Sequence, residues 1–162
     1  MKKLLLGIAA VCLAGFTFAQ DAPLWMRHSV ISPDGTTIAF TYKGDIYTVP
    51  VAGGRAMQIT TNPAYDTAPV WSPDSKRIAF ASDRMGSLDV YIVAKDGGEP
   101  RRLTTHSGSE TPLAFTDAGH VLFSAGIMPS AEAVVFPSNG QFNQVYRVSV
   151  EGGRPTMISS MP

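Results

Sequence analysis

The sequence has little of what most small active sites are built from. Among its 162 residues there are one cysteine, Cys12, and three histidines. A single cysteine cannot form an internal disulfide, and three scattered histidines do not have the spacing of a zinc site. The Gly-x-Ser-x-Gly and His-Glu-x-x-His patterns of common hydrolases are also missing. We therefore expect no catalytic residue, no metal site and no cofactor site in this chain.

Charge of one sign is not in excess either. The 13 lysines and arginines balance 13 aspartates and glutamates, and neither sign forms a block. A nucleic-acid-binding surface needs a basic patch, and an interaction tail needs a run of like charge. We therefore expect no nucleic-acid partner and no charged tail.

The one long apolar run lies at residues 4–18. It follows two lysines and ends next to Ala19, an acceptable small residue for cleavage. This pattern is typical of a secretory signal peptide, and the run is too short to favour a membrane span. We expect residues 1–19 to be removed and the mature chain to be exported without membrane contact. In a double-membraned bacterium the destination would be the periplasm.

Cys12 leaves one alternative for this segment, since a lipoprotein would carry an acyl chain on such a cysteine. Val11 is bulkier than the small residue that usually precedes an acylated cysteine. The sequence therefore favours cleavage of the segment, with lipidation of Cys12 left open.

The most informative positive feature is a segment of about forty residues that occurs three times. Each copy has a turn, a short apolar strand, a strand with a central tyrosine, a Gly-Gly pair and a final Ile/Leu-Thr or Ile-Ser. Copy one contains Ser32-Pro33-Asp34-Gly35, Ile38-Ala39-Phe40, Asp45-Ile46-Tyr47, Gly53-Gly54 and Ile59-Thr60. Copy two contains Ser72-Pro73-Asp74-Ser75, Ile78-Ala79-Phe80, Asp89-Val90-Tyr91, Gly97-Gly98 and Leu103-Thr104. Copy three contains Thr116-Asp117-Ala118-Gly119, Val121-Leu122-Phe123, Gln144-Val145-Tyr146, Gly152-Gly153 and Ile158-Ser159.

Apolar residues alternate with small or polar ones within each copy. In copy one, Ile38, Phe40 and Tyr42 share one face, while the residues between them share the other. Period-two alternation bounded by turn residues predicts strands, and a repeat of this length predicts β-propeller blades. The strands of copy one are expected at about 28–31, 37–42, 45–51 and 56–60. We expect the recurring tyrosines to pack between blades.

The predicted fold class is therefore all-β, with three four-stranded antiparallel blades of an incomplete β-propeller. The predicted domains are a signal peptide at 1–19 and a partial propeller at 20–162, with blades at about 24–61, 66–105 and 111–160. Natural rings have four to eight blades, so we expect an N-terminal piece of a longer protein whose outer blades face missing neighbours. Alone, the chain is a possible homo-oligomer.

Loops between the second and third strands differ in length among the copies. Copy one uses residues 43–44, copy two about 82–88 and copy three about 126–143. These loops leave the sheets at the same edge as the connections between blades, and insertions on one face often mark a binding face. The candidate peptide or partner contacts are Arg27, His28, Tyr65, Asp66, Asp83, Arg84, His106, Glu110 and Phe136. The alternatives are a solvated face and a contact to the missing blades.

The repeated Ser-Pro-Asp, Ile-Ala-Phe, Asp-Ile/Val-Tyr and Gly-Gly elements resemble the TolB-type propeller repeat, although the third copy lacks the proline. The entry Pro23-Leu24-Trp25-Met26-Arg27 and the signal-like start also resemble exported bacterial tricorn-protease homologues. That resemblance implies a propeller scaffold that gates or docks peptides, with further blades and a serine peptidase domain as partners. No catalytic residue of the family matches a position here. A TolB-like binding module and the propeller of a prolyl-oligopeptidase-like hydrolase are the alternatives.

Overall fold

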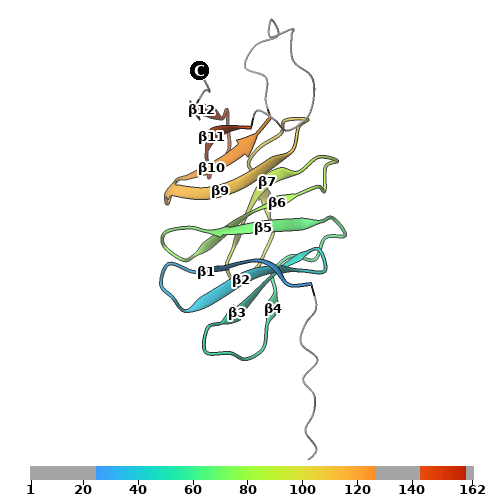
Figure 1. The fold of residues 1–162 in the computed structure, drawn as a ribbon, viewed down its shortest axis with the longest axis vertical. Helices are drawn as coiled ribbons and strands as arrows, with labels where there is room; N and C mark the ends of the chain where they lie inside the picture. The colour runs from blue at the N-terminus through green and yellow to red at the C-terminus, as the bar shows by residue number, and fades with distance from the viewer. Residues whose placement is uncertain (1–24, 127–142, 160–162) are drawn as a thin grey trace, which may run out of the picture.

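The computed structural model describes residues 25–126 and 143–159 and contains three four-stranded antiparallel sheets (Figure 1). The strand order in each sheet follows the chain, so the predicted all-β class with three blades is confirmed. Blade 1 contains β1 (Arg27–Ile31), β2 (Thr37–Tyr42), β3 (Asp45–Pro50) and β4 (Met57–Gln58). Blade 2 contains β5 (Asp66–Trp71), β6 (Arg77–Ser82), β7 (Asp89–Ala94) and β8 (Arg101–Arg102). Blade 3 contains β9 (Glu110–Asp117), β10 (His120–Ala125), β11 (Gln144–Ser149) and β12 (Thr156–Ser159).

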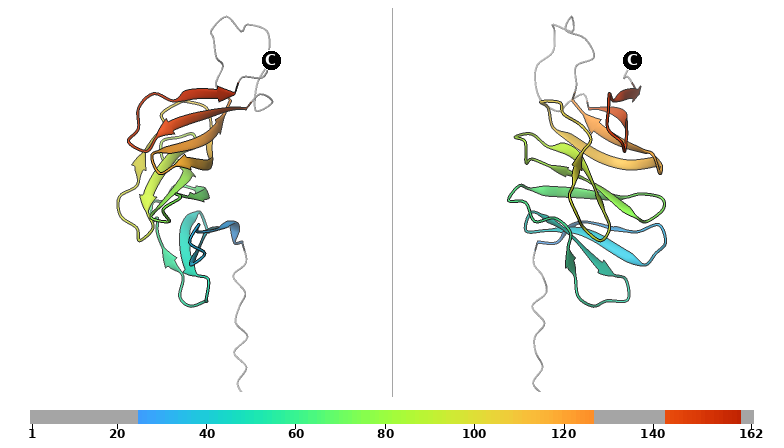
Figure 2. Two further views of the ribbon diagram at one scale, coloured as in Figure 1. Left: turned by 90° about the vertical axis from the view of Figure 1, so that its left-hand side faces the viewer. Right: turned by 180° about the vertical axis from the view of Figure 1, so that it is seen from behind.

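The first strands of the blades lie next to one another. Strand β5 contacts both β1 and β9, and Figures 1 and 2 show the three sheets stacked along the long axis of the molecule. The Nε1 of Trp71 on β5 donates a hydrogen bond to the carbonyl of Val30 on β1, at 3.1 Å. Among the described residues, no helix is long and apolar enough to cross a membrane.

The turn between the first two strands of each early blade is closed by an aspartate, as its sequence predicts. In blade 1, Ser32 Oγ donates to Asp34 Oδ1 at 2.6 Å, and the backbone N–H of Thr36 donates to the same oxygen at 3.0 Å. These donors, that of Ser32 first, hold the pKa of Asp34 below its usual range. Gly35 adopts a φ of 72°, which costs little without a Cβ. Blade 2 repeats the arrangement around Asp74.

The core consists of the contacts between blades. Ile78 and Phe80 on β6 are fully buried and pack with Ala39 and Ile46 of blade 1. The next residue along β6, Ala79, belongs to the other cluster, which includes Phe123 of blade 3. Successive strand residues point to opposite faces, so blade 2 is covered on both sides. Burying each large apolar side chain stabilises the fold by about 1.5–3 kcal/mol.

Two of the three recurring tyrosines pack between blades as predicted, whereas Tyr47 does not; each of the three stacks on a phenylalanine of the neighbouring strand. The ring centroids of Phe80 and Tyr91 are 6.0 Å apart, and the other two pairs are stacked at 5.8 and 5.6 Å. Tyr91 lies in the cluster between blades 1 and 2, and Tyr146 in the cluster between blades 2 and 3. Tyr47 is half-buried because it lies on the side of blade 1 that faces away from blade 2.

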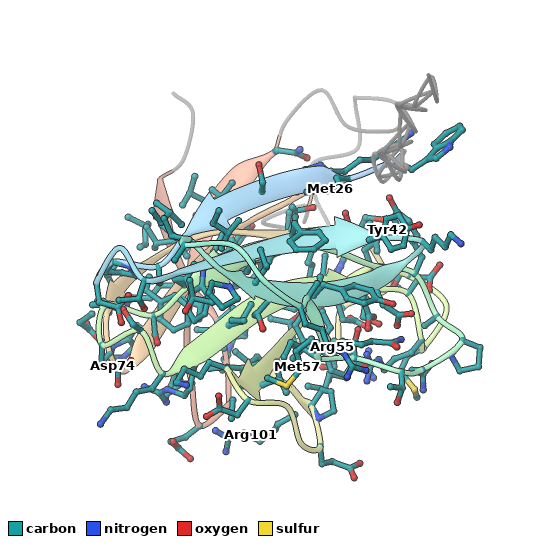
Figure 3. All side chains as sticks on the ribbon, turned by 90° about the horizontal axis from the view of Figure 1, so that it is seen from below. Met26, Tyr42, Arg55, Met57, Asp74 and Arg101 are labelled. Carbon is teal, nitrogen blue, oxygen red and sulfur yellow. The ribbon has the colours of Figure 1, made fainter. Side chains whose placement is uncertain are left out.

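That side of blade 1, which we call the open face, consists of residues at the positions that Ile78, Phe80 and Tyr91 occupy in blade 2. Figure 3 looks at the molecule from this side and labels Tyr42 on the nearest sheet. The open face of blade 1 therefore has the aromatic and aliphatic composition of an internal blade contact. The residues concerned are Ile38, Phe40, Tyr42, Tyr47 and Val49.

The fourth strand of blade 1 is shorter than predicted: the sequence predicts it at about 56–60, and β4 spans only Met57–Gln58. The physical reason is the side chain of Thr60. Its hydroxyl accepts the hydrogen bond of the Ile46 N–H at 3.0 Å, while the Ile46 carbonyl accepts from the N–H of Ile59 at 2.8 Å. A side-chain bond therefore replaces the last rung of the ladder.

Replacing an isoleucine by alanine should cost more unfolding free energy at the contact between blades 1 and 2 than at the equivalent position on the open face of blade 1. Ile78→Ala should lower the free energy of unfolding by about 2–5 kcal/mol, because it leaves a cavity between blades 1 and 2. Ile38→Ala is the matched control, and its cost should be clearly smaller since Ile38 is half-buried on the open face. Urea unfolding followed by tryptophan fluorescence measures both. Equal losses would show that the open face is covered in solution and contradict this account.

Candidate functional site

The predicted binding face is the edge of the sheets at which the loops between second and third strands meet the connections between blades. We call it the loop edge and define it by residues 43–44, 59–65, 83–88 and 103–109. The Ser-Pro-Asp and Gly-Gly turns lie at the opposite edge. Figure 1 shows the two edges on its right and left sides. The order of strands thus places the loops and connections on one edge, as expected.

A groove of about 460 Å³ opens at the loop edge of blade 1. Its lining combines aromatic, cationic and small residues: Trp25, Arg27, Thr41, Lys43, Gly44 and Tyr65. Trp25 and Tyr65 are 71% and 41% exposed. The Arg27 guanidinium carbon lies 5.7 Å from the centroid of the Trp25 ring, in cation–π range. The groove therefore offers apolar surface beside two positive charges.

The buried hydroxyl of Thr41 is the polar feature inside this lining. Thr41 is 2% exposed, and within the described part of the chain its Oγ1 has no hydrogen-bond partner. Most buried hydroxyls are hydrogen-bonded, and an unpaired one costs free energy. The Thr41 hydroxyl is therefore an unpaired polar group buried beneath the groove surface.

The wall of the groove at Tyr65 is held by backbone contacts. Asp83 Oδ1 accepts a hydrogen bond from the Tyr65 N–H at 2.7 Å, and the N–H of Asp66 donates to the carbonyl of Gly44 at 2.7 Å. The first contact ties the connection between blades to the β6–β7 loop. The second ties it to the β2–β3 turn, where Gly44 adopts a φ of 90°. The position of Tyr65 is thus set by two loops.

Behind the groove lies a buried ion pair at the contact between blades 1 and 2, which we call the first junction. The Arg84 guanidinium contacts both oxygens of Asp66 at 3.0 Å, and Asp66 is fully buried. Arg84 Nε donates to Ser82 Oγ at 2.8 Å, and the guanidinium lies 4.5 Å from the centroid of the Tyr91 ring. Both contacts to Asp66 come from Arg84 Nη2, and the guanidinium charge compensates the Asp66 carboxylate inside the protein.

A second carboxylate, Asp45, belongs to the same junction. Thr60 Oγ1 donates to Asp45 Oδ1 at 3.2 Å, and Gln58 Nε2 donates to Asp45 Oδ2 at 3.0 Å. Burial, followed by the charge of Asp66, raises the pKa of Asp45. The first junction therefore holds two carboxylates: Asp66 is paired with an arginine, and Asp45 accepts hydrogen bonds from neutral side chains.

The contact between blades 2 and 3, the second junction, repeats this plan. Asp89 and Glu110 are fully buried, and Arg102 Nη2 lies 2.8 Å from Asp89 Oδ2. The Val90 N–H donates to Thr104 Oγ1 at 2.9 Å, as the Ile46 N–H does to Thr60 in blade 1. Burial raises the pKa of Glu110 to about 7.

The sequence-predicted contacts thus fall into separate places. Arg27 and Tyr65 line the groove, and Asp83 positions Tyr65. Asp66 and Arg84 form the first junction, and Glu110 lies in the second, so that the two acids are buried within blade contacts. The remaining candidates are His28, whose Nδ1 lies 3.0 Å from Thr67 Oγ1, and His106, whose Nδ1 accepts from Gly108 N–H at 3.0 Å. Phe136 lies outside the described residues.

Several residues of the site were not found from the sequence. The groove includes Trp25, Thr41 and Lys43. In blade 1 the segment before β1, strand β2 and the β2–β3 turn lie next to one another and bring these residues together. The junctions had a detectable signal, since an aspartate precedes a threonine by 15 residues in each of the first two copies, as Asp45 and Thr60 show. Among residues 25–126 and 143–159, no three His, Cys, Asp or Glu side chains group as metal ligands.

These features define a β-propeller segment with a groove at one edge. The chain belongs to the family described as the Tricorn protease N-terminal beta propeller domain, which matches residues 23–161. The resemblance to tricorn-protease homologues and TolB-type propellers is confirmed by this match and by the relatives below.

Three relatives illustrate the range of similar proteins. Tricorn protease homolog 1 of Streptomyces coelicolor is 35% identical over 102 residues, or 62% of this chain and 9% of that protein. Uncharacterized peptidase YuxL of Bacillus subtilis is 30% identical over 129 residues, or 78% of this chain and 20% of that protein. The structure of putative TolB from Agrobacterium tumefaciens has a TM-score of 0.66 at 22% identity, and covers 85% of this chain and 50% of that one. The chain therefore spans a small part of its curated relatives.

The first junction predicts a strong dependence of stability on Arg84. Arg84→Ala leaves Asp66 buried without its partner and should lower the free energy of unfolding by about 3–5 kcal/mol. In an Asp66→Asn background the same change should cost far less, because the uncompensated charge is gone. The exposed Arg55→Ala is the control and should change stability by less than about 0.5 kcal/mol. Urea unfolding of the four variants measures this, and a loss for Arg84→Ala that Asp66→Asn leaves unreduced would contradict the ion pair.

Proposed function

We propose that this chain is a propeller scaffold of an exported peptidase and that its loop edge docks or gates peptide segments. Hydrolysis would occur in another part of the protein. Membership of the tricorn propeller family and similarity to two proteins named as peptidase or protease support the class. The signal-like run at residues 4–18 supports export.

The observation that carries the docking proposal is the groove at the loop edge of blade 1. Exposed rings of Trp25 and Tyr65 give a peptide apolar surface at low conformational cost, and Arg27 and Lys43 add two positive charges. The groove therefore suits an extended segment that carries apolar and acidic side chains.

Two other functions are supported by particular similarities. Tol-Pal system protein TolB of Bordetella pertussis is 44% identical over 55 residues, which supports a non-enzymatic binding module. The match to the peptidase YuxL supports a propeller of a prolyl-oligopeptidase-like hydrolase. All three functions would use the same propeller residues. Peptide docking at the groove is therefore shared by the tricorn-like and the prolyl-oligopeptidase-like proposals.

The docking proposal predicts binding that depends on the two groove cations. A fluorescein-labelled peptide of alternating leucine and glutamate should bind the protein, and Arg27→Ala with Lys43→Ala should weaken binding about tenfold or more. The matched control, Arg55→Ala with Lys76→Ala, removes two exposed charges at the opposite edge and should leave affinity within about twofold. Fluorescence anisotropy at fixed salt measures the affinities. Equal weakening by both pairs would reduce the effect to net charge and contradict a site.

A second prediction concerns chemistry. The purified chain should not hydrolyse fluorescein-labelled casein, because its sequence lacks the Gly-x-Ser-x-Gly pattern of a hydrolase nucleophile and we expect the chemistry elsewhere in the protein. Release of soluble fluorescence after each chromatographic step measures residual activity. Turnover that co-purifies with the chain at constant specific activity would contradict the scaffold role while leaving peptide docking untouched.

A further inference from the structure

The two junctions follow the same plan, so they can be compared position by position. Asp66 opens β5 and donates its N–H to the Gly44 carbonyl at 2.7 Å, and Glu110 opens β9 and donates its N–H to the Leu88 carbonyl at 2.7 Å. Asp45 and Asp89 open the third strands of their blades. Each junction therefore brings one carboxyl from the preceding blade and one from the following blade into the protein.

The positive charge is placed differently in the two junctions. In the first, Arg84 from the β6–β7 loop neutralises Asp66, and Gln58 on β4 supports Asp45. In the second, an arginine takes the place of Gln58, since Arg102 pairs with Tyr91 in the ladder as Gln58 pairs with Tyr47. Arg102 lies 2.8 Å from Asp89, so the charge goes to the other carboxyl.

Glu110 is consequently left without a counter-charge. It is 0% exposed, and among the described residues neither of its carboxyl oxygens has a well-formed hydrogen bond, although the neighbouring Thr104 hydroxyl favours the charged form. The sequence has no lysine or arginine between Arg102 and Arg147. A carboxylate that is buried in this way loses its hydration without replacement, and such groups bind a proton instead.

The other charged groups around β9 do not change this balance. On β5, Asp66 is paired with Arg84. On β6 and β10, Arg77 and His120 lie at the opposite edge, where His120 contacts Asp117 of β9. The strands and loops next to Glu110 contribute Asp89 of β7 and Arg102 of β8, and His106 precedes it in an exposed loop. The second junction thus contains two carboxyls facing one guanidinium.

We propose that the second junction is a proton-binding site, in which Glu110 is a neutral carboxylic acid beside the Asp89 carboxylate, and that release of this proton to water weakens the contact between blades 2 and 3. Burial and then the charge of Asp89 raise the pKa of Glu110 to about 7, and the Thr104 hydroxyl and the Arg102 charge oppose the shift. The guanidinium beside Asp89 disfavours a metal ion in place of the proton, because it already supplies the positive charge there.

The sign of the effect follows from the two pKa values. In the unfolded chain Glu110 has the ordinary glutamate pKa of 4.5, and in the folded chain about 7. Between these pH values the folded state holds more protons than the unfolded state, so stability falls as pH rises through this window. Well above pH 7 Glu110 is ionised in both the folded and the unfolded state, so its contribution to stability no longer changes with pH.

The direct test is a carbon NMR titration of the Glu110 side-chain carboxyl in the folded protein, assigned by loss of its signal in Glu110→Gln. The expected midpoint is near pH 7. A Glu110 midpoint between pH 4 and 5 would overturn the proposal. The same titration with calcium chloride and with EDTA should be unchanged, and a displaced midpoint would assign the site to a cation instead.

Stability provides the second readout. Between pH 5.5 and 8.5 the unfolding equilibrium constant of the wild-type protein should rise about thirtyfold more than that of Glu110→Gln, which keeps the shape of the neutral acid and cannot ionise. The matched control Glu99→Gln should keep the wild-type pH dependence. Urea unfolding at the two pH values measures the difference. If Glu110→Gln retained the full wild-type slope, or if Glu99→Gln removed it, the proposal would be wrong.

Discussion

The structure depends on sheets that bury both of their faces against neighbouring sheets. A four-stranded blade has an aromatic and aliphatic side, to which Ile78 and Phe80 contribute in blade 2, and a side of smaller residues such as Ala79. The large side of one blade packs on the small side of the blade before it. This asymmetry gives the stack a direction and lets the same forty-residue pattern be used repeatedly. It also explains why the chain needs no disulfide.

The polar groups at the ends of the strands follow from that packing. Closely packed sheets remove the ends of the third strand and of the following first strand from water, and any carboxyl there must find a partner or stay protonated. Asp66 finds Arg84, Asp45 finds Thr60 and Gln58, and Asp89 finds Arg102. The junctions therefore differ in how charge is compensated although their backbones are built alike. A change of one side chain between repeats alters the electrostatics without altering the fold.

Much of the fold could be read from the sequence because its information is local. The alternation at Ile38 and Phe40 and the Asp34 turn each report on their own strand or hairpin, and three repetitions reinforce the signal. The groove is different, because Thr41 and Tyr65 become neighbours through the meeting of two blades. The burial of Asp66 and Glu110 was also not predictable, since acidic residues in loop sequence usually face water. The arginines of the two junctions, Arg84 in the β6–β7 loop and Arg102 on β8, occupy different positions and pair with different carboxyls, Asp66 and Asp89.

The most direct measurement of this arrangement is native-state hydrogen exchange followed by mass spectrometry. If blade 2 is covered on both sides, amides of β6 and β7 should be the slowest to exchange, and amides of β2, beneath the open face of blade 1, should exchange faster. Peptides that cover 77–82, 89–94 and 37–42 report these regions separately. Fastest exchange in β6 and β7, or equal exchange in all three regions, would contradict the account of a stack held together through its central blade.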